Sequence, residues 1–255
     1  GSWWEGEIKN DKLHGKAILY EAADKCKSEG NWLEFQLNGQ GTVKCEDGFI
    51  SEGNYKNGLL NGQGFLKYSN GTEYSGEFVD GTLNGQGFIR FDTGSEYLGE
   101  FIDDKLNGQG VIKWSSGTIE MGQYKNDNLN GEGSYINYMN EKYEGTFLDG
   151  KRNGKGKFTW SNGDYFEGTW KDDLKFYGTF YYVSGDKQTG KFKNDLLNGK
   201  ATYIKSNGNI YEGDYVDGIE NGKGTYTWAD GDKYEGDYIG GYRTGKGKYT
   251  YKSGT

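Results

Sequence analysis

Residues 74–96 read YSGEFVDGTLNGQGFIRFDTGSE, and this stretch decides the fold. Tyr74, Gly76 and Phe78 occupy alternate positions, which is the period-two pattern of a strand with one apolar face. After the turn residues that follow, Ile89 and Phe91 continue the same alternation. The stretch therefore predicts two strands that share one apolar face.

Glycine-containing dipeptides separate the two predicted strands. Asp80–Gly81 and Asn84–Gly85 indicate the turn between them, and Thr93–Gly94 indicates the turn into the next segment. Asn-Gly and Asp-Gly are the dipeptides that tight hairpin turns prefer. We therefore expect the stretch to form one β-hairpin.

This stretch is one copy of a repeat. Its central glycine recurs at Gly6, Gly30, Gly53, Gly76, Gly99, Gly122, Gly145, Gly168, Gly190, Gly213 and Gly236, at steps of 22 to 24 residues. Eleven copies at so regular a step indicate stacked units rather than one central core. We predict one continuous array over residues 3–255, made of eleven β-hairpin repeats of ~23 residues. Gly1 and Ser2 are interpreted as a cloning remnant, and the array as a fragment of a longer protein.

Two rows of aromatic residues run through the copies. The position two residues after the central glycine holds Ile8, Trp32, Tyr55, Phe78, Phe101, Tyr124, Phe147, Trp170, Phe192, Tyr215 and Tyr238. We expect this row to be the buried spine of the array. A second row at the end of the second strand holds Tyr68, Phe91, Trp114, Trp160, Tyr182, Trp228 and Tyr251. The predicted fold class is all-β, an elongated single-layer solenoid of stacked antiparallel β-hairpins that forms a twisted rod.

The composition supports a sheet and argues against other classes. Hydrophobic residues make up only 33% of the chain, yet 16% is aromatic, which is unlike a disordered chain. Forty-six glycines and no proline fit short strands with tight turns. No apolar run approaches the ~20 residues of a membrane span. Two cysteines, Cys26 and Cys45, are too few for a disulfide framework, and we expect them to be reduced and inert in an intracellular protein.

The motifs of enzymes are not convincing here. The carboxylates beside the central glycines alternate with the rings, so we expect a solvated face rather than acid–base pairs. Two near-matches to a phosphate loop, residues 185–191 and 240–246, lack the Ser or Thr that would hold magnesium. His14 is the only histidine, which leaves no catalytic triad or histidine zinc site. We predict no enzyme activity, cofactor or metal site.

The net charge of −8 hides a basic region. Residues 151–205 hold 11 basic and 6 acidic side chains, a net of +5. A candidate patch for an anionic ligand consists of Lys151, Arg152, Lys155, Lys157, Lys175, Lys191 and Lys193. An anionic lipid or an acidic protein would suit this patch. We expect no nucleic-acid binding, because phosphate backbones require a strongly positive surface.

The repeat resembles the MORN motif, the "membrane occupation and recognition nexus". Tyr234-Glu235-Gly236-Asp237-Tyr238 and Asn221-Gly222-Lys223-Gly224-Thr225-Tyr226 carry the resemblance, which covers the whole chain. It implies a hairpin array with a non-catalytic role in cytoskeletal or membrane-apposition scaffolds, or beside the catalytic domain of a larger enzyme. Copies that depart from the motif include those with Glu120 or Gln188 in place of the first ring, and the shortened copy around Phe176.

We predict an interaction scaffold that docks or spaces partners at a membrane–cytoskeleton structure. A peptide or helix would bind in an aromatic groove lined by Tyr68, Phe91, Trp114, Trp160, Tyr182 and Trp228. The expected location is cytoplasmic, in association with cytoskeleton or membrane. The alternatives are a phosphoinositide-binding module that uses the basic patch, and a regulatory array of a larger enzyme. Homodimerisation through the exposed edge strands also stays open.

Overall fold

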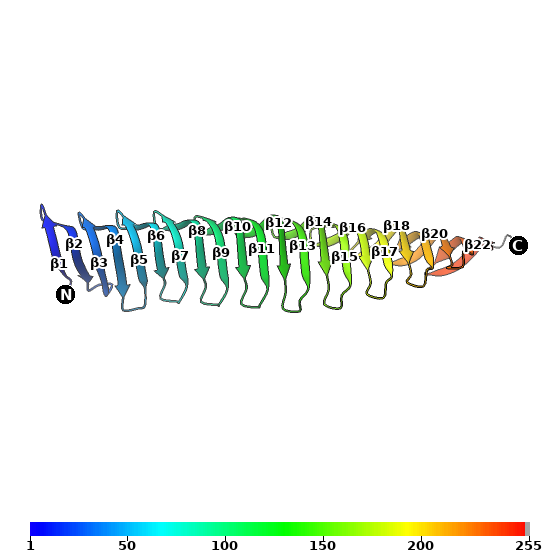
Figure 1. Ribbon diagram of the computed structural model, residues 1–255, viewed down its shortest axis with the longest axis horizontal. Coiled ribbons are helices and arrows are strands. Elements are labelled where there is room, and N and C mark those ends of the chain that lie inside the picture. Colours follow the sequence, from blue (N-terminus) through cyan, green and yellow to red (C-terminus); the bar gives the residue numbers. More distant parts are fainter. Residues whose placement is uncertain (253–255) are drawn as a thin grey trace. The chain divides into compact units, whose positions relative to one another are not determined.

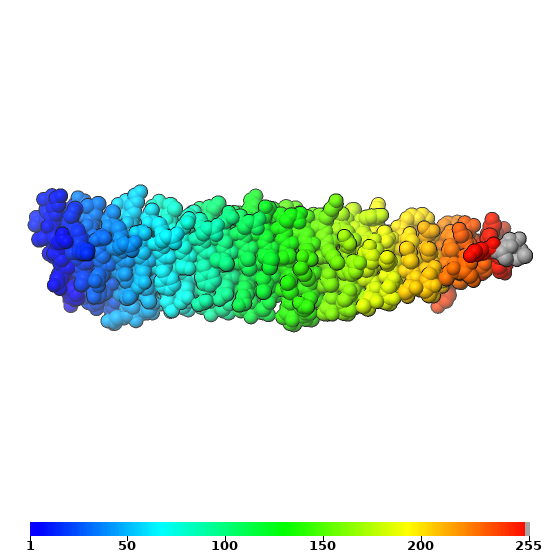
Figure 2. Space-filling view, in the orientation of Figure 1, coloured from blue at the N-terminus to red at the C-terminus, as the bar shows by residue number. Residues whose placement is uncertain are grey.

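A computed structural model describes residues 1–252, so the last three residues of the predicted array lie outside the described part. Within the described residues all regular elements are β-strands, 22 in number, and no helix is present. The chain divides into two compact units, unit 1 at residues 1–129 and unit 2 from residue 130 onward. In each unit the hairpins follow one another in chain order, as the colours of Figures 1 and 2 show.

Unit 1 holds five complete hairpins and one further strand. The strands are β1 (Trp3–Lys9), β2 (Lys12–Glu21), β3 (Cys26–Leu33), β4 (Gln36–Cys45), β5 (Ile50–Lys56), β6 (Leu59–Lys67), β7 (Glu73–Val79), β8 (Thr82–Arg90), β9 (Glu96–Ile102), β10 (Lys105–Lys113) and β11 (Ile119–Lys125). Each of these strands pairs antiparallel with the next one in the sequence.

Unit 2 repeats the pattern. Its strands are β12 (Asn128–Ile136, which begins at the last two residues of unit 1), β13 (Lys142–Leu148), β14 (Lys151–Thr159), β15 (Tyr165–Lys171), β16 (Leu174–Tyr181), β17 (Lys187–Lys193), β18 (Leu196–Ile204), β19 (Ile210–Val216), β20 (Ile219–Thr227), β21 (Lys233–Ile239) and β22 (Tyr242–Thr250). Successive strands are again antiparallel neighbours. The predicted all-β, single-layer arrangement of antiparallel hairpins is confirmed.

The tight turn of each hairpin is shorter than the sequence suggested. Asp80 and Gly81 alone connect β7 to β8, with φ of 47° and 88°, which is the mirror-image conformation that two-residue hairpins require. Asn84–Gly85 was expected to belong to this turn, and that expectation was wrong. It lies inside β8, where the register shifts between Gly76 and Phe78 and Gly85 has a φ of 108°. The dipeptide therefore marks a β-bulge, which glycine accommodates.

A longer connection joins one hairpin to the next. Gly94 donates its backbone N–H to the carbonyl of Phe91 at 2.9 Å, and Phe91 donates to the carbonyl of Ser95 at 2.9 Å. Phe91 thus stands just after β8 rather than in its last position, as do its counterparts in the other copies. The second aromatic row is therefore held by the connections between hairpins, at one edge of the apolar face.

The predicted spine is the core of both units. Ten of its eleven members are buried; Phe78 and Phe101, for example, are each 2% exposed. Ile8 in the first hairpin is the exception, at 56% exposed. A single layer can bury rings this completely because leucine and aromatic side chains of neighbouring strands cover them. We call this side the aromatic face, defined by Phe78 and its row, and the other side the opposite face.

The two cysteines are joined by a disulfide, which overturns the expectation that they are reduced. Cys26 begins β3, Cys45 ends β4, and the register places them directly opposite each other. Their Cα atoms lie 4.0 Å apart. The sequence placed both residues in one copy but did not fix the register that brings their sulfur atoms together.

Candidate binding face

The three predicted groove residues of unit 1 lie along one edge of the aromatic face. Tyr68 is 43% exposed, and Phe91 and Trp114 are half-buried. Tyr97 lies between the latter two, with ring centroids 4.9 Å from Phe91 and 5.7 Å from Trp114. Tyr74 packs against Tyr68 in the same way, at 5.7 Å. These rings contact one another and still present area to solvent.

The predicted groove residues of unit 2 form a similar edge. Trp160 contacts Phe180 at 4.9 Å between centroids, and Phe180 contacts Tyr182 at 4.5 Å. Trp228 lies in the next hairpin but one, 4.9 Å from Tyr226. All of these side chains are half-buried. We call the exposed rings of both units the edge row: Tyr68, Phe91 and Trp114 in unit 1, and Trp160, Tyr182 and Trp228 in unit 2.

Several contributors to this edge were not predicted. Tyr97 and Phe180 each lie between two edge-row rings, and Tyr226 packs against Trp228. The antiparallel register brings them beside the edge row, since Tyr97 pairs with Ile112 and Phe180 with Phe166. Only the register could have found them.

A third row on the aromatic face distinguishes the two units. It is the apolar position just after each tight turn, and we call it the leucine row: Leu13, Leu37, Leu60, Leu83, Leu106, Leu129, Arg152, Lys175, Leu197, Glu220 and Arg243. All six members of unit 1 are buried leucines. Four of the five members in unit 2 are charged, which the sequence analysis did not single out as a pattern.

The central glycines explain how charge is accommodated there. In unit 1 the leucine covers the glycine pair, so a Cβ added to Gly110 would lie 3.0 Å from Leu106. In the hairpin with Arg152, the ring of Tyr143 covers the pair instead and would collide with a Cβ on Gly156. Phe166, Tyr211 and Tyr234 do the same in the hairpins with Lys175, Glu220 and Arg243. In each of these hairpins either a leucine or an aromatic ring fills the space above the glycine pair. Where a ring fills it, the leucine-row position does not need an apolar side chain and can hold a charged one.

The predicted basic patch does not form one surface. Arg152 and Lys175 lie on the aromatic face, because they pair with Phe147 and Trp170. The other five members are exposed residues of the opposite face or of the hairpin ends: Lys151, Lys155, Lys157, Lys191 and Lys193. Lys157 lies between Glu144 and Glu167 in the register, so carboxylates interrupt the positive charge there.

Arg152 is held firmly on the aromatic face. Its guanidinium carbon lies 4.3 Å from the ring centroid of Trp170, and its Nε donates to Asp173 Oδ1 at 3.1 Å. Its Nη2 donates to the backbone carbonyl of Asp173 at 2.8 Å. Stacking and these two hydrogen bonds hold the planar guanidinium in place. Arg152 therefore adds positive charge to the aromatic face, but its guanidinium group is not free to bind a ligand.

Two carboxylates also reach the aromatic face. Glu120 replaces the first ring of its copy, and burial raises its pKa while the Trp114 indole N–H donates to it. Glu220 is in the leucine row; burial raises its pKa, and the charge of Lys205 opposes that rise. Nearby, Lys205 Nζ lies 5.6 Å from the ring centroid of Tyr203. Burial raises the pKa of the Tyr203 hydroxyl, which donates to Asp186 Oδ2 at 2.7 Å. The aromatic face of each unit thus carries isolated charges set among rings.

The opposite face is solvated, as predicted, but apolar side chains also lie on it, and those beside the tight turns include the exposed Val79, Ile102 and Val216. Seven of the carboxylates that flank the central glycines are exposed there: Glu7, Glu77, Glu100, Glu144, Glu167, Glu212 and Glu235. In unit 1 a cross-strand row of Phe65, Ser75, Phe88, Leu98, Val111 and Met121 interrupts them. Leu98 is 56% exposed.

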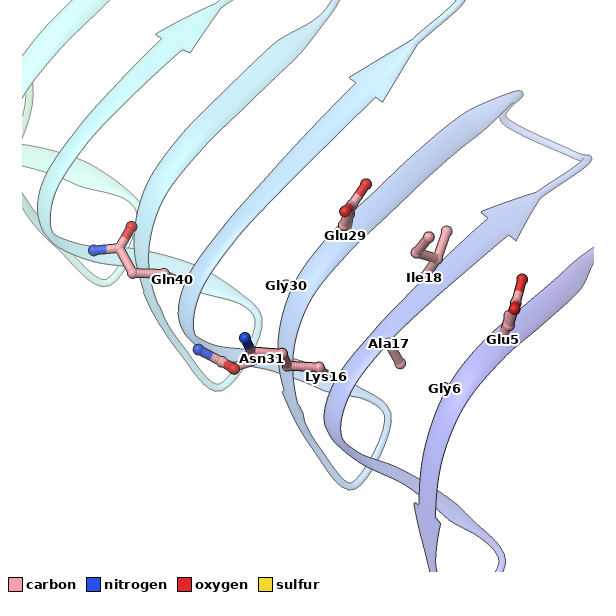
Figure 3. A pocket seen from close by; sticks show the side chains of 9 residues that line it. All are labelled: Glu5, Gly6, Lys16, Ala17, Ile18, Glu29, Gly30, Asn31 and Gln40. Carbon is pink, nitrogen blue, oxygen red and sulfur yellow. The ribbon is translucent and has the colours of Figure 1, made fainter.

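Shallow hollows also mark the opposite face where the glycine rows leave backbone bare. Figure 3 shows the one over β1–β4, where Glu5, Ile18 and Glu29 line one side. Lys16, Asn31 and Gln40 line the other side. Similar hollows lie over β13–β16 and over β16–β19. They follow from the repeat itself and gather no convergent set of polar groups.

Residues 1–252 contain no cluster of three or more His, Cys, Asp or Glu side chains that could hold a metal ion. Over the same residues, no helix has the length and apolar character needed to cross a bilayer.

Comparison with solved structures gives distant likenesses. The TCP10 domain of CPAP from Danio rerio is 8% identical, with 77% of this chain and 93% of that chain covered and a TM-score of 0.45. The SAS-4 (dCPAP) TCP domain of Drosophila melanogaster, in complex with a proline-rich motif of Ana2, is 14% identical over 57% of this chain and 84% of that chain, with a TM-score of 0.37. Virginiamycin B lyase from Staphylococcus aureus is 10% identical over 98% and 88%, with a TM-score of 0.17. No curated protein sequence matches the chain significantly.

The sequence profile of the MORN repeat matches ten segments of the chain. They are residues 4–20, 52–73, 74–96, 97–119, 121–138, 143–165, 166–187, 189–210, 211–233 and 234–255. The hairpin of β3 and β4, which contains the disulfide, falls between the first two segments, so the structure has one more hairpin than the profile matches. Because the matches cover most of the chain, it belongs to the MORN repeat family.

Proposed function

We propose that the chain is a non-catalytic protein-interaction module that binds a partner segment along the edge row of its aromatic face. The observation that carries the proposal is the contrast between two rows of one face. The spine row is buried within each unit, whereas the edge row retains solvent-exposed ring area. Edge-row rings that served only to stabilise the fold would gain nothing from this exposure.

The edge row has the properties of an interface anchor. Aromatic rings contribute large contact areas and lose little conformational entropy when they bind. Trp160 and Tyr182 are already fixed by contacts with Phe180, so the binding surface is preorganised. A partner that covers these rings with apolar side chains would gain hydrophobic energy without reordering the sheet. Docking at a membrane–cytoskeleton structure remains the prediction for where such a partner resides.

Peptide selection with matched variants tests this proposal. A random linear peptide library displayed on phage would be selected against the full chain, and the peptides found would be measured with Phe91→Ala, Trp160→Ala and Tyr182→Ala. Removing an anchoring ring should weaken binding about tenfold or more, as at interface hot spots. Tyr177→Ala is the control, because Tyr177 is 50% exposed and lines a hollow of the opposite face.

The outcome that contradicts the proposal is equally specific. If the library yields no binder, or if Tyr177→Ala weakens binding while the edge-row variants do not, the edge row is not the binding surface. Circular dichroism melting of each variant separates loss of binding from loss of fold.

A second candidate is binding to an anionic lipid headgroup. The net charge of +5 in residues 151–205 and the exposed Lys155, Lys157 and Lys191 of the opposite face favour it. Co-sedimentation with phosphoinositide-containing liposomes at physiological salt is the test. Charge reversal of these three lysines to Glu should abolish pelleting if this candidate is correct. Reversal of Arg152 is unsuitable, since it would break the contact with Asp173.

A further inference from the structure

The charged leucine-row member of β16 is Lys175, and the packing beneath it determines where its side chain lies. In this hairpin Phe166 fills the glycine gap, so that a Cβ added to Gly178 would lie 2.7 Å from Phe166 Cζ. Lys175 therefore cannot fold over the glycines as Leu106 does in unit 1. Its side chain instead lies half-buried among the rings of the aromatic face.

Four aromatic rings surround that ammonium group. The distances from Lys175 Nζ to the ring centroids are 5.6 Å for Trp160, 5.9 Å for Phe166, 5.1 Å for Phe180 and 5.3 Å for Phe192. Ring faces attract a cation but do not accept strong hydrogen bonds from its three donors. Burial lowers the pKa of Lys175, which agrees with a partly desolvated charge.

One oxygen of each nearby carboxylate already accepts hydrogen bonds from other donor atoms. Asp195 Oδ1 accepts the backbone N–H of Lys175 at 3.0 Å. Asp173 Oδ1 accepts both the backbone N–H of Arg152, at 3.0 Å, and its Nε, at 3.1 Å. Lys175 Nζ forms no ion pair with any residue that the structure describes. The site thus presents a half-buried ammonium group whose oxygen acceptor is not supplied by residues 1–252.

We propose that Lys175 binds a carboxylate side chain of the partner segment, so that unit 2 selects an acidic residue flanked by apolar ones. The inference rests on the proposed function, because the flanking residues would cover Trp160 and Tyr182 of the edge row. Charge complementarity favours an acidic occupant, since two cations, Arg152 and Lys175, lie on the aromatic face here and only Arg152 is ion-paired among the described residues. A charge-assisted hydrogen bond formed among rings is stronger than one formed in open water.

The test uses the phage-displayed random peptide library on the full chain. Peptides that bind unit 2 should be enriched in Asp or Glu next to apolar residues. Lys175→Gln should weaken their binding about tenfold or more, whereas Lys175→Arg should retain most of it. Lys155→Gln is the matched control. This substitution removes the same charge, but Lys155 is exposed on the opposite face.

A double-mutant cycle separates a direct contact from a general charge effect. Replacing the acidic residue of a selected peptide by its amide should cost as much as Lys175→Gln, and the two changes together should cost little more than either one. Selected peptides without acidic enrichment, or equal losses for Lys155→Gln and Lys175→Gln, would overturn the role of Lys175 and leave the edge row intact. If the library yielded no binder at all, both the proposed function and the role of Lys175 would be overturned.

Discussion

The ring of Tyr143 in β13 lies over Gly156 in β14 and occupies the space that a side chain at residue 156 would need. All three atoms nearest to a Cβ added there belong to Tyr143. In unit 1 the corresponding space is filled by a leucine, and the corresponding ring position holds Ser28 or Ser51 in two of the hairpins. The glycine pair, the ring and the leucine-row residue therefore pack against one another and depend on one another's size.

Gly156→Ala should destabilise unit 2 by about 1–3 kcal/mol, because the added methyl group must displace the Tyr143 ring. Tyr143→Ser should also destabilise it, by loss of a buried ring. The double variant should be more stable than the sum of the two effects predicts, by about 1 kcal/mol. Chemical denaturation of the four proteins measures this coupling. Strict additivity would show that the ring and the glycine do not share the space.

The spine and edge rows should differ in what they contribute to stability. Phe101→Ala removes a ring that is 2% exposed and should cost about 3–5 kcal/mol. Phe91→Ala removes a half-buried ring that packs edge-to-face on Tyr97, and the loss should be about 1 kcal/mol. Melting curves of the two variants give the comparison. Equal losses would mean that the edge row is part of the core, which would remove the main support for a binding role.

The fold could be predicted from the repeat, whereas the contacts of individual side chains could not. The period of the central glycine and the alternation around Phe78 were enough to predict hairpins and a buried spine. The position of Asn84–Gly85 was misread, because a bulge and a turn use the same dipeptide and only the register separates them. The predicted basic patch combined Arg152 and Lys175 with Lys155, whereas strand alternation separates them: Arg152 and Lys175 pair with spine residues, and Lys155 pairs with Thr169 on the opposite face.

The disulfide should stabilise unit 1 specifically. The 19-residue separation of Cys26 and Cys45 predicts about 3 kcal/mol in the chain-entropy account of cross-links. Cys45→Ser should therefore lower hydrogen-exchange protection in β3 and β4 and leave β15 to β18 unchanged. Mass spectrometry of exchanged peptides resolves the two regions. A reductant that left protection of β3 and β4 unaltered would show that the cross-link adds nothing to the hairpin.

Glu220 should make stability depend on pH in the acidic range. Burial raises its pKa in the folded state above the ordinary value of 4.5, so the folded state binds a proton more readily than the unfolded state. The charged form therefore costs stability at neutral pH, and that cost disappears as the pH falls below about 4. Glu220→Gln should raise the melting temperature at pH 7 and not at pH 4. Glu212→Gln, at an exposed residue of the opposite face, is the control.

Hydroxyl-radical footprinting of the chain with and without a selected peptide tests the central claim most directly. It reports the solvent exposure of individual aromatic side chains by mass spectrometry. Binding along the edge row predicts reduced oxidation of Phe91 and Trp114, or of Trp160 and Tyr182, with Tyr177 unchanged. Protection confined to the opposite face, at Phe88, Leu98 or Tyr177, with unchanged oxidation of the edge row, would contradict the account.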